Sequence, residues 1–296
     1  MRKPRAMPID ALPMLPPLPG WIMSGPAESL NAAMFRSGAV LAHLTLVTTA
    51  KDLPQTLWRD RLALAAAEIC VGHSGRREGA GALRDAVHLT KAGDDPGPSG
   101  RVYRQWSRAV ARPISVSNLG RALEGVAPER IVLCLNATGP TPVDRAAQVI
   151  EAVLEGNPRG ETAALILADA ALAKSLGWTH VLPLLSLALK ARDLRLRGDE
   201  LRLACHRAVG VGVQQALPLA GELARAAVRL RAVVPKLRAK GAARAVDLVL
   251  SHDALSPAAL VAFMSDRAAR RLCDRLVALG AVRELTGRDT FRLYGV

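Results

Sequence analysis

Apolar side chains recur at intervals of three or four residues along most of this 296-residue chain, which is the spacing of one face of an α-helix. The clearest case is the segment TPVDRAAQVIEAVLEG, residues 141–156. Thr141 is a typical N-cap, Pro142 suits the first helical position, and Gly156 suits the position after the last helical residue. The apolar stripe of this helix would consist of Val143, Ala146, Ala147, Ile150, Val153 and Leu154. A chain built from such segments is expected to fold as packed helices.

Composition supports this expectation. Half of the residues are hydrophobic but only 3% are aromatic. Alanine and leucine favour helices, whereas a β-sandwich needs more β-branched and aromatic residues. The predicted helices lie at about residues 28–47, 54–72, 81–90, 100–111, 141–156, 161–176, 182–191, 200–216 and 219–233. We therefore predict an all-α, multi-helix body.

Proline and glycine mark the boundaries between segments. Residues 1–26 are proline-rich and predict an irregular N-terminal arm, and KAGDDPGPSG at 91–100 predicts a loop. The segment RIVLCLN at 130–136 fits either a short strand or a buried helix. We expect an arm over 1–26, an all-helical domain over 27–235 and a distinct C-terminal domain over 236–296.

The C-terminal residues follow a different pattern. Helices are predicted at 242–253, 256–264 and 265–280, with Ser256 and Ser265 as N-caps and Gly280 after the last of them. AVRELT and TFRLY then read as short strands around Gly287, which can take a positive φ in a hairpin turn. Three helices followed by a hairpin is the order of a winged-helix domain.

The arrangement of arginines in this tail suggests contact with DNA. A helix that carries guanidinium groups opposite an apolar stripe can lie in a major groove, where arginines reach phosphates or guanine edges. The hairpin arginines would contact the DNA backbone or the minor groove. The candidate DNA-binding residues are Arg267, Arg270, Arg271 and Arg275 on the helix and Arg283, Arg288 and Arg292 on the hairpin.

The charge of the chain is consistent with a polyanionic partner. Its formal net charge is +14, although residues 243–296 hold eight basic and six acidic side chains. The preceding stretch RLRAVVPKLRAK, residues 229–240, has no acidic residue. Lys236, Arg238 and Lys240 could therefore extend the phosphate-contacting surface, or they could form only a solvated basic linker. A DNA-binding regulatory protein is the function that we expect.

Two other classes of function stay open. Winged-helix domains also bind proteins, so the tail could be a non-enzymatic interaction module, and the helical body could dimerise or bind a ligand or partner. The second alternative is a metal-dependent or hydrolytic enzyme. Its site would use Asp85, His88, Asp94, Asp95 and Arg101 around the 85–101 loop. Against it, Asp94 and Asp95 could simply shape a turn.

Other features predict the environment of the protein. The four cysteines are widely spaced, without a CxxC pair, and are expected to be reduced thiols rather than metal ligands; no cofactor is predicted. We also expect no membrane span, because the best apolar run, at 162–178, is interrupted by Asp169 and Lys174. A cytoplasmic location is expected.

The chain as a whole resembles the alphaproteobacterial family described as domain of unknown function 1403. The resemblance is carried by LPPLPGW (15–21), LRDAVHLTKAGDDPGPSGR (83–101), LGW (176–178) before LPLL (182–185), PKLRAKGA (235–242) and the tail. The tail itself is similar to the winged helices that accompany Fic-type proteins, in which a hairpin of the form LxxLGxVRExTGR recurs. A Fic adenylyltransferase needs an HPFxxGNGR-like loop, and no histidine of this chain begins one.

Overall fold

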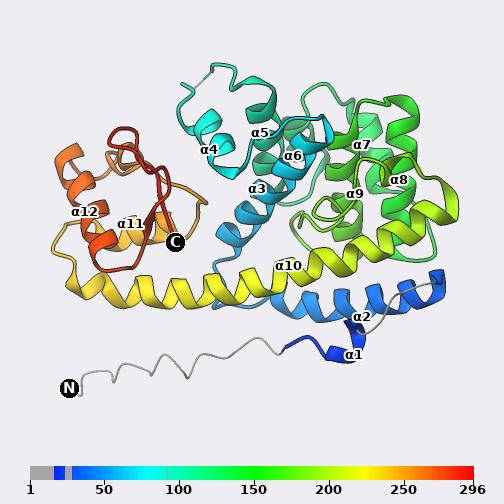
Figure 1. Ribbon diagram of the computed structural model, residues 1–296, viewed down its shortest axis with the longest axis horizontal. Coiled ribbons are helices and arrows are strands. Elements are labelled where there is room, and N and C mark those ends of the chain that lie inside the picture. Colours follow the sequence, from blue (N-terminus) through cyan, green and yellow to red (C-terminus); the bar gives the residue numbers. More distant parts are fainter. Residues whose placement is uncertain (1–16, 24–28, 92) are drawn as a thin grey trace.

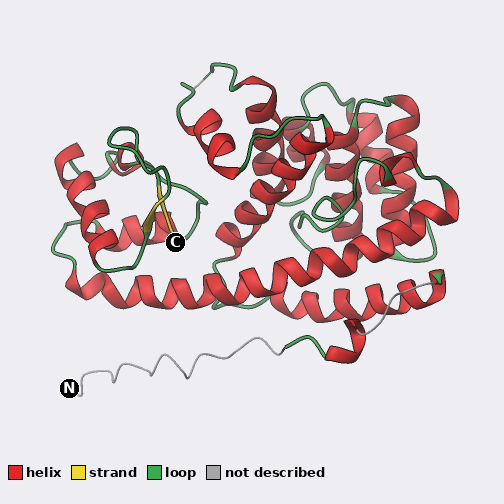
Figure 2. Ribbon diagram, in the orientation of Figure 1, coloured by secondary structure: helices red, strands yellow, loops and turns green. Residues whose placement is uncertain are grey.

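A 36-residue helix, α10 (Gly198–Val233), runs along one side of the whole molecule in this computed structural model. The structure describes residues 17–23, 29–91 and 93–296, so most of the proline-rich arm expected over 1–26 lies outside the described residues. Figure 1 shows the helical body over one half of α10 and the C-terminal segment over the other half. Among the described residues the chain is mostly helical, with one small hairpin near its C-terminal end (Figure 2).

The body is built from nine helices before α10 in the described part of the chain. In chain order they are α1 (Gly20–Met23), α2 (Leu30–Thr48), α3 (Gln55–His73), α4 (Ala80–His88), α5 (Gly97–Ala111), α6 (Val116–Ala122), α7 (Pro128–Leu135), α8 (Pro142–Gly156) and α9 (Glu161–Ser175). The segment at 130–136 is thus a helix, and the helix predicted at 141–156 is confirmed. The Thr141 hydroxyl accepts a hydrogen bond from the Asp144 N–H, although Gly156 is the last helical residue and not the one after it.

The centre of the body is α9. All ten residues from Ala164 to Ala173 are buried, so this helix has no solvent face and is surrounded by α3, α5, α7 and α8. A helix that is apolar on every side belongs in the core of a bundle. The one charged residue in this stretch, Asp169, is completely buried.

The helix predicted at 182–191 is absent, because the Asp169 carboxylate binds the backbone there. It accepts hydrogen bonds from the N–H groups of Leu184 (3.1 Å), Leu185 (2.9 Å) and Ser186 and from the Ser186 hydroxyl (2.9 Å). These donors point at one carboxylate instead of continuing into a helix. The segment is irregular and leads to the 3₁₀-helix η2 (Asp193–Arg195).

The two helices predicted at 200–216 and 219–233 are one helix. Pro218 lies inside α10, where proline removes one backbone hydrogen bond and usually costs about 3 kcal/mol. Val213 and Ala216 before it and Ala220 and Leu223 after it are buried, and α10 packs against α2, α3 and α8. Burial of this continuous stripe offsets the lost bond.

The loop predicted at 91–100 is shorter than expected, since α5 begins at Gly97. Pro98 occupies the first turn, where its missing N–H has no helical partner to lose. Gly100 is buried, and a Cβ atom there would lie 2.6 Å from the Cβ of Pro96 and 3.1 Å from the Cβ of Ala86 in α4. Glycine thus allows a close helix contact at this position.

The sequence suggested no segment with the length and composition of a membrane span. Helix α2 does have them. It has 19 residues with a mean hydropathy of 1.2, but only one-third of them are buried inside the protein. It lies along α10 (Figure 1) and buries Val40, Leu44 and Val47. A mostly buried helix of a globular protein and a signal sequence meet the same criteria, so length and composition alone do not assign α2 to a membrane.

The C-terminal segment, defined as residues 242–296, follows the short 3₁₀-helix η3 (Val234–Lys236). It contains α11 (Ala242–Val249), the 3₁₀-helix η4 (Pro257–Leu260), α12 (Asp266–Ala278) and strands β1 (Arg283–Glu284) and β2 (Tyr294–Gly295). The strands pair antiparallel, with Glu284 opposite Tyr294.

Two expectations for this segment are corrected. The helix predicted at 256–264 is only the one-turn η4, and the Ser256 hydroxyl does not cap it. The strands are shorter than AVRELT and TFRLY, because residues 285–293 form a long loop between them. Gly287 has the expected positive φ of 62°.

Candidate nucleic-acid interface

Four of the predicted DNA-contacting arginines lie on α12. The Ser265 hydroxyl caps the helix by accepting a hydrogen bond from the Ala268 N–H (3.3 Å), and Gly280 ends the turn after it with a φ of 64°. Ala269, Leu272, Cys273 and Leu276 are buried, whereas the arginines Arg267, Arg270, Arg271 and Arg275 are exposed. The predicted separation into an apolar and a basic face is therefore present.

These four arginines differ in their partners. Arg270 Nε donates to Asp266 one turn earlier, at 2.9 Å. Arg267, Arg271 and Arg275 form no ion pair with the residues that the structure describes. They follow each other at intervals of four, so their Cα atoms are about 6 Å apart along one side of the helix. This row carries the positive charges of α12 that no ion pair with a described residue balances.

The hairpin arginines lie on different sides of the segment. Arg288 donates two hydrogen bonds to the Asp85 carboxylate of α4, at 2.9 and 2.7 Å. Arg292 lies 3.5 Å from Asp289 and 4.0 Å from Asp274 of α12, whereas Arg283 is exposed beside α10. Of the three, Arg292 lies beside α12, whereas Arg288 contacts α4 and Arg283 lies beside α10.

The pair between Asp85 and Arg288 joins two sites that the sequence suggested separately. Asp85 was a candidate enzyme residue and Arg288 a candidate DNA contact, 203 positions apart. A bidentate arginine–carboxylate pair is a directional contact. It holds the tip of the hairpin loop against the helical body.

A second contact between the C-terminal segment and the helical body involves a buried aspartate, Asp253. Asp253, which is 1% exposed, pairs with Arg84 of α4 (2.6 and 3.0 Å) and with Arg61 of α3. The Asp253 N–H also donates to the Asp60 carboxylate at 2.8 Å. Burial raises the pKa of Asp60 and lowers the pKa of Arg61. The contact between the segment and the body is thus a largely buried cluster of charges around Asp253.

The basic connector, residues 234–241, leads from α10 toward the N-terminal end of α12. Lys236, Arg238 and Lys240 are exposed, and they have no ion pair within the described residues. Gly241 takes a φ of 92°, and the Arg244 guanidinium stacks on the Phe263 ring at 4.6 Å. Since Phe263 lies two residues before the cap Ser265 of α12, the end of the connector is near the start of that helix.

The residues of the alternative enzyme site do not come together. His88 lines a cavity of about 620 Å³ between the end of α4 and the hairpin loop, beside Leu89, Arg270 and Phe291. Asp95 instead accepts from the Gly97 N–H (3.0 Å) and pairs with Arg101 (2.6 Å), at the start of α5. Asp94, Asp95 and Arg101 line another cavity, of about 260 Å³. No group of three or more His, Cys, Asp or Glu side chains in the described part of the chain could hold a metal ion.

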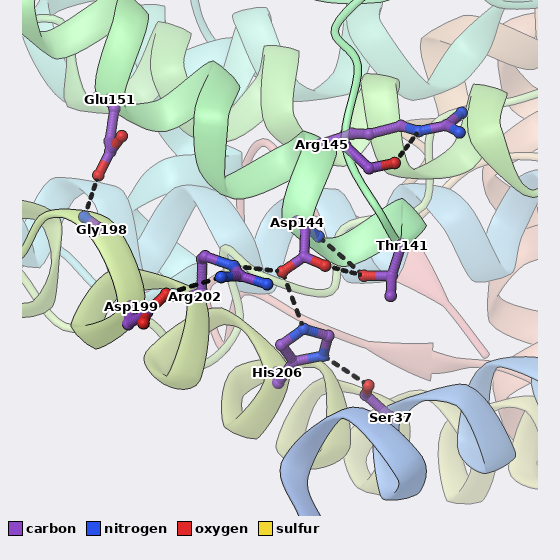
Figure 3. A network of polar contacts seen from close by, with 10 residues as sticks. Ser37, Thr141, Asp144, Arg145, Glu151, Gly198, Asp199, Arg202 and His206 are labelled. Atoms are coloured by element: carbon purple, nitrogen blue, oxygen red, sulfur yellow. Dashed lines mark hydrogen bonds and ion pairs between the residues drawn. The ribbon is translucent and has the colours of Figure 1, made fainter. Parts of the chain in front are cut away.

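A Ser–His–Asp arrangement that the sequence did not predict lies inside the body (Figure 3). Ser37 of α2 is 2.7 Å from Nδ1 of His206 of α10, and the other ring nitrogen is 3.3 Å from the Asp144 carboxylate of α8. The three residues are separated by more than 60 positions in the sequence, so no local motif signals them. All three are at least 98% buried, and therefore no substrate can reach the Ser37 hydroxyl.

This network holds helices rather than presenting a nucleophile. Burial alone would raise the pKa of Asp144, but hydrogen bonds from Arg202 (2.7 Å) and Thr141 (2.7 Å) hold that pKa below its usual range. Burial lowers the pKa of His206, so its ring is neutral near pH 7 and can donate to Asp144 and accept from Ser37. The contacts connect α2, α8 and α10 in the interior.

The four cysteines are buried and free, as expected for reduced thiols. The Cys70 sulfur accepts a hydrogen bond from the Trp106 indole at 3.4 Å. Burial raises the pKa of the Cys70 and Cys273 thiols to about 12. Thiols of this kind are poor nucleophiles, because the reactive form is the thiolate.

Comparison with known proteins places the chain in a family. The model of a family described as "Protein of unknown function (DUF1403)" matches residues 7–296. The chain belongs to this family. The family-level resemblance seen in the sequence is thus confirmed over nearly the whole length of this DUF1403 protein.

The finer parts of the resemblance have no such support. No curated protein and no solved structure matches the chain. The family match says nothing of a winged helix or of an association with Fic-type proteins. The function of this DUF1403 protein must therefore be argued from its own residues.

Proposed function

We propose that this DUF1403 protein binds double-stranded DNA through α12, with the C-terminal segment acting as a winged-helix domain. The single observation that carries the proposal is the row of Arg267, Arg271 and Arg275, exposed and without ion-pair partners among the described residues. A helix with such a row can enter a major groove and place guanidinium groups against phosphates or guanine edges.

The order of elements supports the winged-helix assignment. Helix α11 is followed by Leu255, which exchanges two backbone hydrogen bonds of 2.9 Å with Tyr294 of β2. Helices η4 and α12 come next, and then the hairpin of β1 and β2. A winged helix has this succession, with a short first strand that pairs with the last one. In it, α12 takes the place of the recognition helix.

The net positive charge of residues 243–296 is small, so DNA binding would also need basic residues outside this segment. Six acidic side chains accompany the eight basic ones in residues 243–296, and Arg270, Arg288 and Arg292 lie beside acids of the protein itself. The connector residues Lys236, Arg238 and Lys240 add three positive charges near the start of α12. The proposed DNA interface therefore consists of Arg267, Arg271, Arg275 and the connector, and the helical body is left to dimerise or to bind a ligand or partner.

The test is a gel shift of the full chain against genomic fragments at several salt concentrations. We expect Arg271→Ala to weaken binding about fivefold or more and to reduce the salt slope by about one phosphate contact. Arg270→Ala should weaken it less, because Asp266 already neutralises this side chain. The control is Arg195→Ala, which removes an exposed arginine from η2 in the body.

Two results would contradict the proposal. One is the absence of any retarded band at low salt. The other is an equal loss of affinity in the Arg195→Ala and Arg271→Ala variants, which would indicate a response to total charge alone.

A further inference from the structure

A second basic site lies in a cavity whose lining residues differ from those of the cavity beside His88. It is a cavity of about 370 Å³ between α3, α10 and the turn that leads into β1. Its charged lining consists of Arg61, Arg225, Arg229 and Arg283, with Glu222 as the one acidic side chain. Four guanidinium groups from three separate elements thus surround one concave space.

The fold places each of these groups for a different reason. Glu222, Arg225 and Arg229 are spaced by three and four residues, so they share one exposed face of α10. Arg283 follows the turn at 280–282, whose residues Ala281 and Val282 are buried. Arg61 lies deeper, with its side chain 15% exposed, and its Nη2 donates to a Val296 oxygen at 2.9 Å.

The positive charges are poorly balanced. Arg61 pairs with Asp253, which also carries Arg84. Arg225, Arg229 and Arg283 form no ion pair with any described residue. Glu222 and the Val296 oxygen that accepts from Arg61 line the same cavity. Arg283 is close enough to Arg61 that its charge, together with burial and Arg84, opposes protonation and lowers the pKa of Arg61. Four arginines thus line the cavity together with one acidic side chain.

We propose that this cavity binds a compact anion that carries a phosphate group. Guanidinium groups recognise phosphate through paired N–H donors, and arginine keeps its charge at every physiological pH. A volume of about 370 Å³ lies at the lower end of the range for small-molecule sites, which suits a phosphorylated small molecule. Arg229 and Arg283 reach the anion from α10 and β1, and Arg61 forms the floor.

This inference does not depend on DNA binding by α12. The phosphate could belong to a free small molecule or to the backbone of DNA, since the chemistry of recognition is the same. The site uses Arg225 and Arg229, which are absent from the interface proposed above, and shares with the sequence-based candidates only Arg283.

Inorganic pyrophosphate is the probe. We expect it to bind the full chain saturably in calorimetry and to raise the melting temperature, at an ionic strength held constant with NaCl. Arg229→Gln and Arg283→Gln should each weaken binding about tenfold or more, because each removes charged hydrogen bonds to the anion. Arg231→Gln is the matched control: it removes an exposed arginine of the same helix that does not line the cavity.

A duplex oligonucleotide then distinguishes the two sources of phosphate. If Arg229→Gln loses pyrophosphate and keeps its affinity for the duplex, the site takes a free small anion. If both affinities fall together and the duplex displaces pyrophosphate, the site holds a phosphate of DNA. The proposal is overturned if pyrophosphate gives no saturable binding, or if Arg231→Gln weakens it as much as Arg229→Gln. Neither result bears on binding by Arg271, so the two proposals fail separately.

Discussion

Single buried polar residues decide how the helices of this protein meet. Asp169 is the clearest example, because one carboxylate at the centre of α9 gathers three backbone N–H groups and one hydroxyl from 184–186. Burial raises the pKa of Asp169 to about 6, although each of these hydrogen bonds acts in the opposite direction. The residue that interrupts an apolar run in the sequence is the anchor of a buried loop in the fold.

His206 gives a prediction at the same scale. Burial holds its pKa below the ordinary value of 6.5 in the folded state. Below that value the unfolded chain binds a proton that the folded chain does not bind. The contribution of His206 to stability is therefore complete above about pH 6.5 and is lost as the pH falls, by at most about 1.4 kcal/mol per pH unit.

Chemical denaturation of the wild type and of His206→Gln between pH 7 and pH 5 measures this effect. The free energy of unfolding of the variant should be lower at pH 7 but should fall less steeply toward pH 5. Because other groups titrate equally in both proteins, only the difference between the two slopes is diagnostic. Parallel slopes would show that folding leaves the pKa of His206 unchanged, which would contradict the prediction.

At the scale of elements, close contacts between helices and loops depend on individual glycines. Gly212 of α10 lies against the backbone of Leu184, and an added Cβ would overlap the Leu184 carbonyl oxygen. Gly38 of α2 is also in a helix, but nothing lies within 4 Å of the position of its Cβ. The two residues are therefore a matched pair for substitution.

We expect Gly212→Ala to lower the free energy of unfolding by about 1–3 kcal/mol, because the irregular segment at 182–191 must move away from α10. Gly38→Ala should leave stability unchanged or raise it by up to about 1 kcal/mol, since alanine has the higher helix propensity. Urea denaturation at neutral pH measures both. An equal stability of the two variants would contradict the close approach of Leu184 to α10.

At the scale of the molecule, charged contacts attach the C-terminal segment to the helical body. Asp253 is the buried part of this attachment, and the pair between Asp85 and Arg288 is its half-exposed part. The hairpin loop at 285–293 is thus held by α4. The paired residues are 203 positions apart, so no local sequence pattern predicts this contact. An attachment of this kind can be weakened at its edge without loss of the fold.

Asp85→Asn tests this attachment. Removal of the charge should lower the free energy of opening of the hairpin loop by about 1 kcal/mol. The amides of residues 285–293 should therefore exchange about fivefold faster with deuterium. Asp95→Asn, which breaks the surface pair with Arg101, should leave exchange in this loop unchanged. Equal protection of the loop in the Asp85→Asn variant and the wild type would show that Arg288 does not hold it.

The local parts of this fold could be predicted from the sequence. Thr141 and Pro142 begin α8, Ser265 begins α12, and Gly280 and Gly287 take positive φ, because caps and turns depend on a few neighbouring residues. The family resemblance belongs to the same level. The predicted helix boundaries were wrong where contacts with distant residues outweigh the local preference. Asp169 prevents a helix at 184–186, and the buried stripe around Pro218 keeps α10 continuous.

The candidate sites required the tertiary structure. The sequence by itself determined that arginines occupy one face of α12 and that an apolar stripe occupies the other. Only the fold decided that Arg288 meets Asp85, that Arg283 joins Arg225 and Arg229 around a cavity, and that Arg267, Arg271 and Arg275 stay without partners among the described residues. The physical reason is that helical periodicity acts over four residues, whereas an ion pair depends on which elements the packing of the core brings together.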